Sequence, residues 1–286
     1  MHLEAASVSR RQFLQVTAAA AVAAATPRLF AQAAADPYRG FRVGIQSYSL
    51  RGYGVADALK YTQTLGLKLW EAFPGHLPMS NVPAKIAEQK ALLAAHGVTV
   101  TGYGVLKFDT NETQARSQFE FAKAMGIEAL SADPDKDSAT FDLLDKLVAE
   151  YGVAIAIHNH GPGHRYNKIS DVADIVRDRH PKIGACVDTG HYLRSDEKPE
   201  EAIERLGKRV FGVHLKDVKT VTSGGKSSKQ FKILGEGDLN IVGCLKALKA
   251  FDYQYTVALE YEENPDNPLS DLEVCLQNLR AAAAKA

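Results

Sequence analysis

Cysteine is scarce in this chain, and its scarcity excludes two classes of protein. The 286 residues include only three cysteines, Cys186, Cys244 and Cys275, and no Cys-x-x-Cys pair. Cysteines so few and so widely spaced cannot form a disulfide framework, and they lack the spacing of a zinc knuckle or a redox dithiol. We therefore expect all three to be buried apolar residues.

The chain also lacks an excess of charge of either sign. Lys+Arg and Asp+Glu both number 34, so the formal net charge at pH 7 is +0. Non-specific nucleic-acid binding draws on clustered positive charge, and we expect no nucleic-acid partner. A hydrophobic content of 45% is that of an ordinary globular chain and excludes a disordered one.

The apolar stretch near the N-terminus is too short for a membrane anchor. Residues 16–25 fall well short of the roughly twenty residues that cross a bilayer. The stretch follows Ser9-Arg10-Arg11-Gln12-Phe13-Leu14 and precedes Ala31-Gln32-Ala33, a pattern that resembles a twin-arginine signal peptide with its cleavage site. The resemblance implies that residues 1–33 are removed and that residues 34–286, one catalytic domain, are exported folded to the periplasm or beyond, with no permanent anchor.

The mature chain alternates strand-like and helix-like segments. Eight short apolar runs have the length and composition of strands, at residues 43–45, 67–70, 98–100, 127–130, 153–157, 183–187, 210–213 and 255–259. Amphipathic stretches lie between them, including one opened by Pro83, one starting near Ser138 and one capped by Ser170. Eight such units in about 250 residues predict a single α/β (β/α)8 TIM barrel.

Two features bear on that prediction. A doubly wound open sheet is the alternative, but it would carry a glycine fingerprint after the first strand, where this chain has Gln46-Ser47-Tyr48-Ser49. The longest interruption, residues 216–239, contains a Gly/Ser-rich segment and is predicted to be a mobile loop.

Polar residues follow most of the predicted strands. Because the carboxyl ends of the strands meet at one end of a (β/α)8 barrel, these residues are expected to converge: Gln46, Glu71, Tyr103, His158, Asn159, His160, Asp188, His214 and Glu260. Imidazole and carboxylate groups without a thiolate suit a divalent ion of the Mn, Fe, Co or Zn group. We expect one such ion, with manganese favoured, held by His158, Asp188, His214 and Glu260.

Five short motifs at strand ends or in loops resemble those of the xylose isomerase-like TIM barrels, which include sugar-phosphate isomerases and epimerases, inosose dehydratases and endonuclease IV. They are Ile157-His158-Asn159-His160-Gly161, Val187-Asp188-Thr189-Gly190-His191, Val213-His214-Leu215-Lys216-Asp217, Leu234-Gly235-Glu236-Gly237-Asp238 and Leu259-Glu260-Tyr261-Glu262. The resemblance implies the same four metal ligands. It also implies that His191 lies near the metal or substrate and that Lys216 and Glu71 face the substrate pocket.

One departure from the family pattern affects the expected reaction. Many isomerases and epimerases of this family have glutamate where this chain has His158, and they use it with the last-strand carboxylate, here Glu260, as a pair of acid-base groups. The resemblance predicts a sugar isomerase- or epimerase-like enzyme that abstracts a proton beside a metal-polarised carbonyl. The alternative within the fold is a lyase, with His160 or Glu71 removing the proton before β-elimination from a 3-keto sugar or inosose.

Other roles stay open for several residues. Asp188 can instead cap the following turn, Glu71 can serve a structural ion pair, and His160 and His191 can be ligands, bases or partners that orient a ligand. Tyr103 is expected to contact the substrate, with other aromatic residues near the mouth. His76 and His164 are expected at the surface, and Glu262 in solvent.

The substrate and the function class also have alternatives. An unphosphorylated sugar, glycoside or cyclitol is the expected partner. A non-catalytic sugar-binding barrel is the alternative of another class, and an endonuclease-like phosphodiesterase is disfavoured because its additional histidines are missing. Pairing of two chains through outer helices would give a homo-oligomer.

Overall fold

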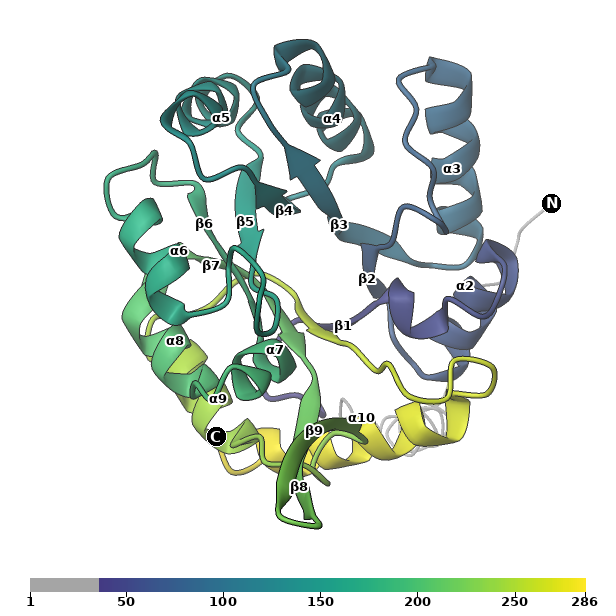
Figure 1. Ribbon diagram of the computed structural model, residues 1–286. Helices are drawn as coiled ribbons and strands as arrows, with labels where there is room; N and C mark the ends of the chain where they lie inside the picture. Colours follow the sequence, from purple (N-terminus) through teal and green to yellow (C-terminus); the bar gives the residue numbers. More distant parts are fainter. Residues whose placement is uncertain (1–35) are drawn as a thin grey trace, which may run out of the picture. The chain divides into compact units, whose positions relative to one another are not determined.

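The computed structural model describes residues 36–286 and contains a closed barrel of eight parallel strands (Figure 1). In chain order they are β1 (Val43–Gln46), β2 (Leu69–Ala72), β3 (Thr99–Phe108), β4 (Ala129–Pro134), β5 (Ala154–His158), β6 (Ile183–Asp188), β7 (Val210–Leu215) and β10 (Val257–Leu259). The pairing of β10 with both β7 and β1 closes the barrel. The predicted TIM barrel is confirmed, while the predicted signal peptide, residues 1–33, lies outside the described residues.

Helices surround the barrel, as the alternating sequence pattern predicted. They are α2 (Val55–Thr64), α3 (Pro83–Ala95), α4 (Glu112–Met125), α5 (Ser138–Tyr151), α6 (Ile169–Val176), α7 (Thr189–Arg194), α8 (Pro199–Leu206), α9 (Ile241–Lys249) and α10 (Leu269–Ala283), with 3-10 turns at Ser47–Leu50 and Gly207–Arg209. Side chains of Asn111 and Asp137 cap the first turns of α4 and α5. The prediction that Ser170 caps α6 is wrong, because Ser170 lies inside that helix.

The barrel wall is almost fully apolar on its outer side. Ile45, Leu130, Ile155, Val187 and Leu259 are each 0% exposed, because the strands are covered by helices. All three cysteines are free and buried, as predicted. In the part of the chain that the structure describes, no helix has the length and apolar character needed to span a membrane.

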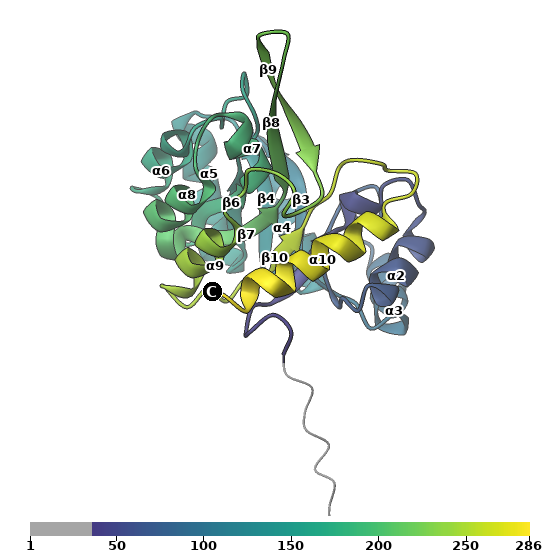
Figure 2. The ribbon, with the colours of Figure 1, turned by 90° about the horizontal axis from the view of Figure 1, so that it is seen from below.

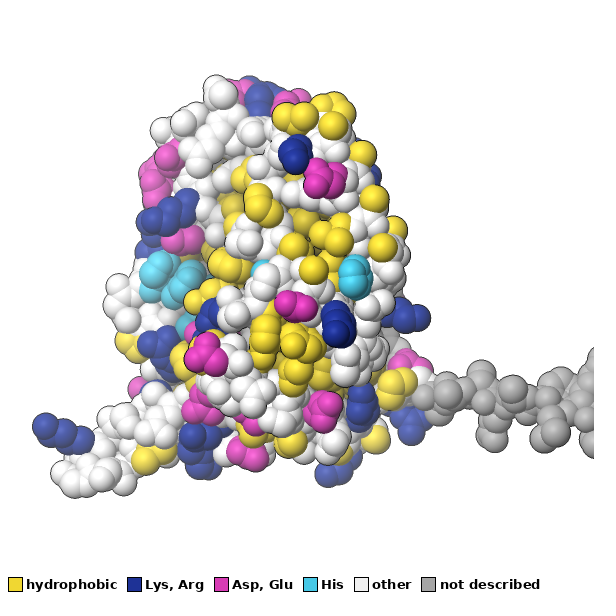
Figure 3. Space-filling view, turned by 90° about the vertical axis from the view of Figure 1, so that its right-hand side faces the viewer, with side chains coloured by type: hydrophobic (Ala, Val, Ile, Leu, Met, Phe, Trp, Pro, Cys, Tyr) yellow, Lys and Arg dark blue, Asp and Glu magenta, His cyan; other side chains and the backbone are white. Residues whose placement is uncertain are grey.

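Helix α3 is the least covered of the surrounding helices. Leu93 is its only buried residue, and Val82, just before it, is 56% exposed. Figure 3 shows hydrophobic side chains exposed on the face of the molecule that carries this helix. The expected homo-oligomer stays a prediction.

A β-hairpin extends from the end of β7. Strands β8 (Asp217–Ser223) and β9 (Lys226–Lys232) pair antiparallel over their whole length, and Figure 2 shows them projecting away from the barrel. Residues 216–239, predicted to be a loop, therefore contain a regular hairpin, and the loop assignment is wrong for β8 and β9. Gly224 and Gly225 have φ of 57° and 75°, which allow the tight turn, and the Asp217 carboxylate fixes the base by accepting from the backbone amides of Gly235, Gly237 and Leu239.

Candidate active site

A cavity of about 310 Å³ opens where the carboxyl ends of the strands meet. It is lined by Gln46, Tyr48, Phe73, Gly104, Val105, His158, His160, His191, Arg194, His214, Lys216, Phe231, Glu260 and Glu262. Most of the residues predicted from strand ends are among them. Asp188 lies against this set and is 0% exposed, whereas Glu71 and Tyr103 do not line the cavity.

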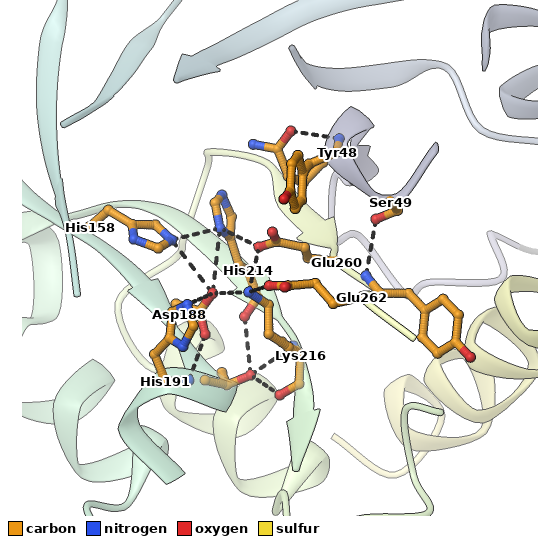
Figure 4. A network of polar contacts seen from close by, with 12 residues as sticks. Tyr48, Ser49, His158, Asp188, His191, His214, Lys216, Glu260 and Glu262 are labelled. Atoms are coloured by element: carbon orange, nitrogen blue, oxygen red, sulfur yellow. Dashed lines mark hydrogen bonds and ion pairs between the residues drawn. The ribbon is translucent and has the colours of Figure 1, made fainter. Parts of the chain in front are cut away.

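The four predicted metal ligands point toward one another in Figure 4. One donor atom from each of His158, Asp188, His214 and Glu260 lies within 4.8 Å of the other three. Nδ1 of His214 is 3.1 Å from Nε2 of His158, 3.8 Å from Oδ2 of Asp188 and 2.8 Å from Oε2 of Glu260. These side chains come from β5, β6, β7 and the residue after β10, so one half of the barrel mouth supplies the whole set.

The spacing and chemistry of these atoms fit a divalent ion. Ligand atoms about 2.1 Å from a tetrahedral metal lie about 3.4 Å apart, close to the distances observed. Asp188 Oδ2 and Glu260 Oε2 are buried without a hydrogen bond of regular geometry, and the ion pair of each with Lys216 Nζ, at 3.0 and 3.2 Å, leaves lone pairs free for a cation. Two imidazoles and two carboxylates are a donor set suited to Mn, Fe, Co or Zn.

Glu71 orients His214 from the barrel interior. Its Oε2 lies 2.8 Å from His214 Nε2, and its Oε1 accepts from the side-chain amide of Gln46 at 3.0 Å. Because Nε2 faces Glu71, Nδ1 is left facing the other three ligands. Glu71 is 5% exposed and does not line the cavity. This position is unsuited to the predicted role of base, and the contacts of Glu71 correspond to the alternative role, a structural ion pair.

Asp188 fills two roles at once. Its Oδ1 accepts from the backbone amide of His191 at 2.7 Å and caps α7, while Oδ2 faces the other ligand atoms. The amide of Asn159 pairs with the backbone of Asp188 in both directions, at 2.8 and 2.9 Å. The oxygen that caps the helix and the oxygen that is the candidate metal donor are different atoms of one carboxylate, so the two roles are compatible.

Lys216 is a buried cation surrounded by carboxylates. Its Nζ lies 3.0 Å from Asp188 Oδ2 and 3.2 Å from Glu260 Oε2, and it donates to Glu262. Burial by itself lowers the pKa of Lys216. The negative charges of Asp188, Glu260 and Glu262 raise it by more than burial lowers it, so the pKa of Lys216 is above its usual value. The expectation that Glu262 is only solvated is wrong, since it lines the cavity and pairs with Lys216.

The electrostatics of Glu260 and His214 are set by the same cluster. Burial raises the pKa of Glu260, but the charges of Lys216 and His214 lower it to about 2. Burial lowers the pKa of His214, while the negative charges of Glu71 and Glu260 beside its ring raise it well above its usual value. Glu260 is therefore a carboxylate at neutral pH.

His160 lines the cavity beside the ligand cluster. Its ring is 4.6 Å from that of His158 and 4.1 Å from that of His164, centroid to centroid, and its Nδ1 is buried without a partner. Burial, then the charges of His158 and other histidines, lower the pKa of His160 to about 2, so the ring is neutral at physiological pH. His164 is 32% exposed, so it lies at the surface as expected, but its ring packs against His160 at a tilt of 37° and its Nε2 lies 3.5 Å from Asp133.

His191 is held in one tautomer by Arg194. Nη1 of Arg194 lies 3.0 Å from His191 Nδ1, and because a guanidinium only donates, Nδ1 must accept and the proton must lie on Nε2. That Nε2 is 4.0 Å from Asp188 Oδ2, on the side of the ligand cluster. Burial lowers the pKa of His191 to about 3, so it faces the site as a neutral donor.

Tyr103 and His76 lie elsewhere than predicted. Tyr103 is 0% exposed, packs on Phe121 and donates its hydroxyl to the carbonyl of Leu77 at 2.9 Å, so it does not contact the cavity. Strands expose alternate side chains to opposite faces, and Tyr103 points to the helical layer. His76 is buried, with its ring nitrogens 3.0 Å from Ser47 Oγ and from the Tyr53 carbonyl.

Five cavity residues were not predicted to line it, and three of them have side chains that bear on the chemistry: Arg194, Phe231 and Glu262. Arg194 is the last residue of α7, and Phe231 lies on β9 of the hairpin that was predicted as a loop. Glu262 stands two residues after Glu260, which directly follows β10. The spacing Asp188, His191, Arg194, at i, i+3 and i+6, was the signal available for the arginine, since such positions share a helix face. Tyr48 and Phe73, which were among the aromatic candidates, do line the cavity.

The fold and the site define a class, that of (β/α)8 barrels with a candidate metal centre at the carboxyl ends of the last four barrel strands. Residues 59–279 match the sequence model of the xylose isomerase-like TIM barrel family, and the chain belongs to that family. Residues 7–27 match the model of the TAT (twin-arginine translocation) pathway signal sequence.

Curated relatives match part of the chain. An inosose dehydratase of Clostridium botulinum (strain Alaska E43 / Type E3) is 29% identical over 140 residues, 44% of this chain and 47% of that protein. The rhizopine catabolism protein MocC of Rhizobium meliloti is 27% identical over 158 residues, 51% of this chain and 48% of that protein. The chain thus spans about half the length of the curated relatives it matches.

Solved structures share the fold over most of the chain. The probable 3-DHS dehydratase AsbF of Bacillus anthracis superposes with a TM-score of 0.67 at 13% identity, covering 84% of this chain and 98% of that chain. The IOLI protein with a bound zinc atom superposes with a TM-score of 0.62 at 17% identity, covering 86% and 96%. At these identities the likeness shows the fold alone.

Proposed function

We propose that the mature chain is an exported, divalent-metal-dependent enzyme that abstracts a proton next to a carbonyl of a sugar, keto-sugar, glycoside or cyclitol. The observation that carries the proposal is the set of four converging donor atoms from His158, Asp188, His214 and Glu260. A buried cluster of this kind is far more than sugar binding needs. This is the reason to favour an enzyme over a non-catalytic sugar-binding barrel.

His158, Asp188, His214 and Glu260 would hold the ion, which when bound supplies a Lewis acid that acidifies the C–H beside a coordinated carbonyl. The protein residues have separate tasks. His191 presents its Nε2 proton to a substrate oxygen, and Lys216 fixes a positive charge beside Glu260. His160, which lines the cavity with Nδ1 unpartnered, is our candidate for the group that accepts the proton.

Elimination is the reaction we favour over two-base epimerisation. Epimerisation through two bases needs an acid-base group on each face of the substrate. The cavity carboxylates Glu260 and Glu262 both follow β10 and both pair with Lys216, and on the opposite side of the cluster stands His158. The curated relatives named inosose dehydratases support the same choice. Isomerisation by one base is the second candidate.

The proposed location and metal rest on separate observations. The match of residues 7–27 to a twin-arginine signal supports export of the folded domain. The zinc atom bound by the IOLI protein supports a divalent ion in this chain as well, and manganese, iron and cobalt suit the same donors as zinc.

The first test is elemental analysis of residues 34–286 beside His214→Ala, with His96→Ala as the control variant. His96 contacts Gln63 on the outside of the barrel, far along the chain from the site. We expect about one Mn, Fe, Co or Zn per chain in the wild type and in the control, lost in His214→Ala while circular dichroism stays unchanged. A wild-type protein that binds no divalent ion after reloading would contradict the proposal and favour a sugar-binding barrel.

The second test separates the reactions. The metal-loaded protein is incubated with 3-keto-glucosides and inososes in deuterated water. Elimination gives an unsaturated carbonyl that absorbs in the ultraviolet, whereas isomerisation or epimerisation gives deuterium incorporation without that chromophore. We expect the chromophore, and His160→Ala should abolish it while the bound metal is retained.

A further inference from the structure

Arg194 places a guanidinium in the cavity wall without an acidic partner. Its one hydrogen bond is to the neutral ring of His191, at 3.0 Å. Its other contacts are packing contacts: its Cζ lies 5.6 Å from the centroid of the Phe231 ring, and a Cβ on Gly161 would come within 2.8 Å of it. No ion pair within residues 36–286 includes Arg194, which leaves most of its donors free for a ligand.

The other cation of the cavity is already neutralised. Lys216 contacts Asp188, Glu260 and Glu262, so its charge is balanced within the protein. Arg194 is therefore the uncompensated charge on the side of the cavity formed by α7 and β9.

We propose that Arg194 binds a carboxylate of the substrate, so that the substrate is an acidic sugar or cyclitol derivative, of the uronate type. This rests on the proposed function in one respect, that the cavity takes a sugar-like molecule. A planar guanidinium fork matches the two oxygens of a carboxylate. Phe231 and Gly161 flank Arg194 and position its side chain.

The charge count favours a carboxylate over a phosphate ester. A phosphate group carries close to two negative charges at pH 7, and away from the proposed metal position the cavity wall offers one cation without a carboxylate partner, Arg194. The two glycines of segment 234–238, Gly235 and Gly237, both donate their backbone amides to Asp217 and do not form a phosphate site.

The test measures binding, not turnover. Metal-loaded protein, residues 34–286, is titrated with D-glucuronate, D-glucose and D-glucose 6-phosphate by ligand-observed NMR. We expect glucuronate to bind about tenfold or more tightly than glucose, as befits a charge-assisted hydrogen-bonded pair. Arg194→Gln should abolish this preference, so that glucuronate binds no more tightly than glucose. Gln is chosen because its amide can still donate to His191 and preserve the tautomer.

Two further variants make the result decisive. Arg205→Gln, which breaks an exposed pair with Asp174 on the outer helices, should leave the preference intact. Arg194→Lys keeps the charge without the planar fork and should retain part of the glucuronate preference. It serves as the test variant if Arg194→Gln fails to fold, and a reduced preference is then the expected result. A glucuronate preference that persists without Arg194 would mean that the carboxylate binds the metal, and it would overturn the proposal.

The remaining outcomes also discriminate. Tighter binding of glucose 6-phosphate than of glucuronate, lost in Arg194→Gln, would overturn the carboxylate in favour of a phosphate. The titration repeated on metal-free protein separates this inference from the proposed function: an Arg194-dependent preference there supports the anion site even if no metal ever binds. Equal binding of glucuronate and glucose overturns the inference while leaving the metal site intact.

Discussion

Oε2 of Glu71 lies 2.8 Å from Nε2 of His214, and this contact joins the second strand of the barrel to the seventh across its interior. The ring of His214 is thereby fixed with Nδ1 toward Glu260, Asp188 and His158. Carboxylates that hold the far nitrogen of a histidine ligand in this way set both its orientation and its tautomer.

Glu71→Gln should weaken metal binding without unfolding the barrel. The amide introduced by the substitution can donate its N–H to Nε2 of His214. Nε2 must then accept, so the proton of the His214 ring lies on Nδ1, and a protonated Nδ1 cannot bind a metal. Loss of such a partner typically lowers metal affinity about 10- to 100-fold, to be measured by competition with a chelator. Glu128→Gln, which breaks a half-exposed pair with Arg42, is the matched control; equal affinities in all three proteins would show that Glu71 does not orient the ligand.

Lys216→Met should destabilise the metal-free protein. Three carboxylates would lose their buried counter-charge, and removing one partner of a buried ion pair commonly costs about 3–5 kcal/mol of unfolding free energy. Added divalent ion should reduce the difference in unfolding free energy between Lys216→Met and the wild type, because the ion would neutralise Asp188 and Glu260. Urea denaturation with and without metal measures both effects, with Lys219→Met on the exposed hairpin as control. A deficit that metal leaves unchanged would argue against a cation site at these carboxylates.

Gly190→Ala should disturb the site through Lys216. A Cβ at Gly190 would lie 2.7 Å from Cγ of Lys216, and overpacking of this kind costs about 1–3 kcal/mol. Gly54→Ser is the control, since a Cβ there meets nothing within 4 Å and serine is a good N-cap residue for α2. Thermal unfolding compares the two; a Gly190→Ala protein as stable as wild type would mean that the Lys216 stem moves freely.

Asp171 should make the start of α6 sensitive to acid. Its carboxylate accepts from the backbone amides of Asn167 and Lys168 and pairs with Lys136. Burial raises the pKa of Asp171, but these contacts lower it to a net value below the usual one. A lowered carboxyl pKa stabilises the fold above the unfolded pKa of about 3.9, and this stabilisation is lost as pH falls through the folded pKa.

Asp171→Ala is therefore expected to cost about 1 kcal/mol at pH 7 and progressively less below about pH 4. Asp171→Asn keeps an acceptor oxygen but no charge, so its unfolding free energy should lose that part of the pH dependence. Urea denaturation at pH 3 to 7 tests both variants. A difference between wild type and Asp171→Ala that is the same at every pH would contradict the assigned cause.

The sequence alone determined the barrel fold and the four candidate metal ligands that converge at one half of the barrel mouth. Strand-length apolar runs alternating with amphipathic helices leave few other ways to bury so many strands on both faces. Residues directly after a parallel strand must converge, which is why the strand pattern by itself places His158, Asp188, His214 and Glu260 together.

Only the tertiary structure decided what each polar residue faces. A strand exposes its neighbours to opposite sides, so Tyr103 and Glu71, both on predicted strand ends, could not be sorted between the helical layer, the barrel interior and the cavity from periodicity alone. The same limit hid the hairpin that carries Phe231 and the helix turn that brings Arg194 to His191. Some of these contacts join residues far apart in the chain, and others depend on a side-chain rotamer. Neither the long-range pairing nor the rotamer can be read from the local sequence.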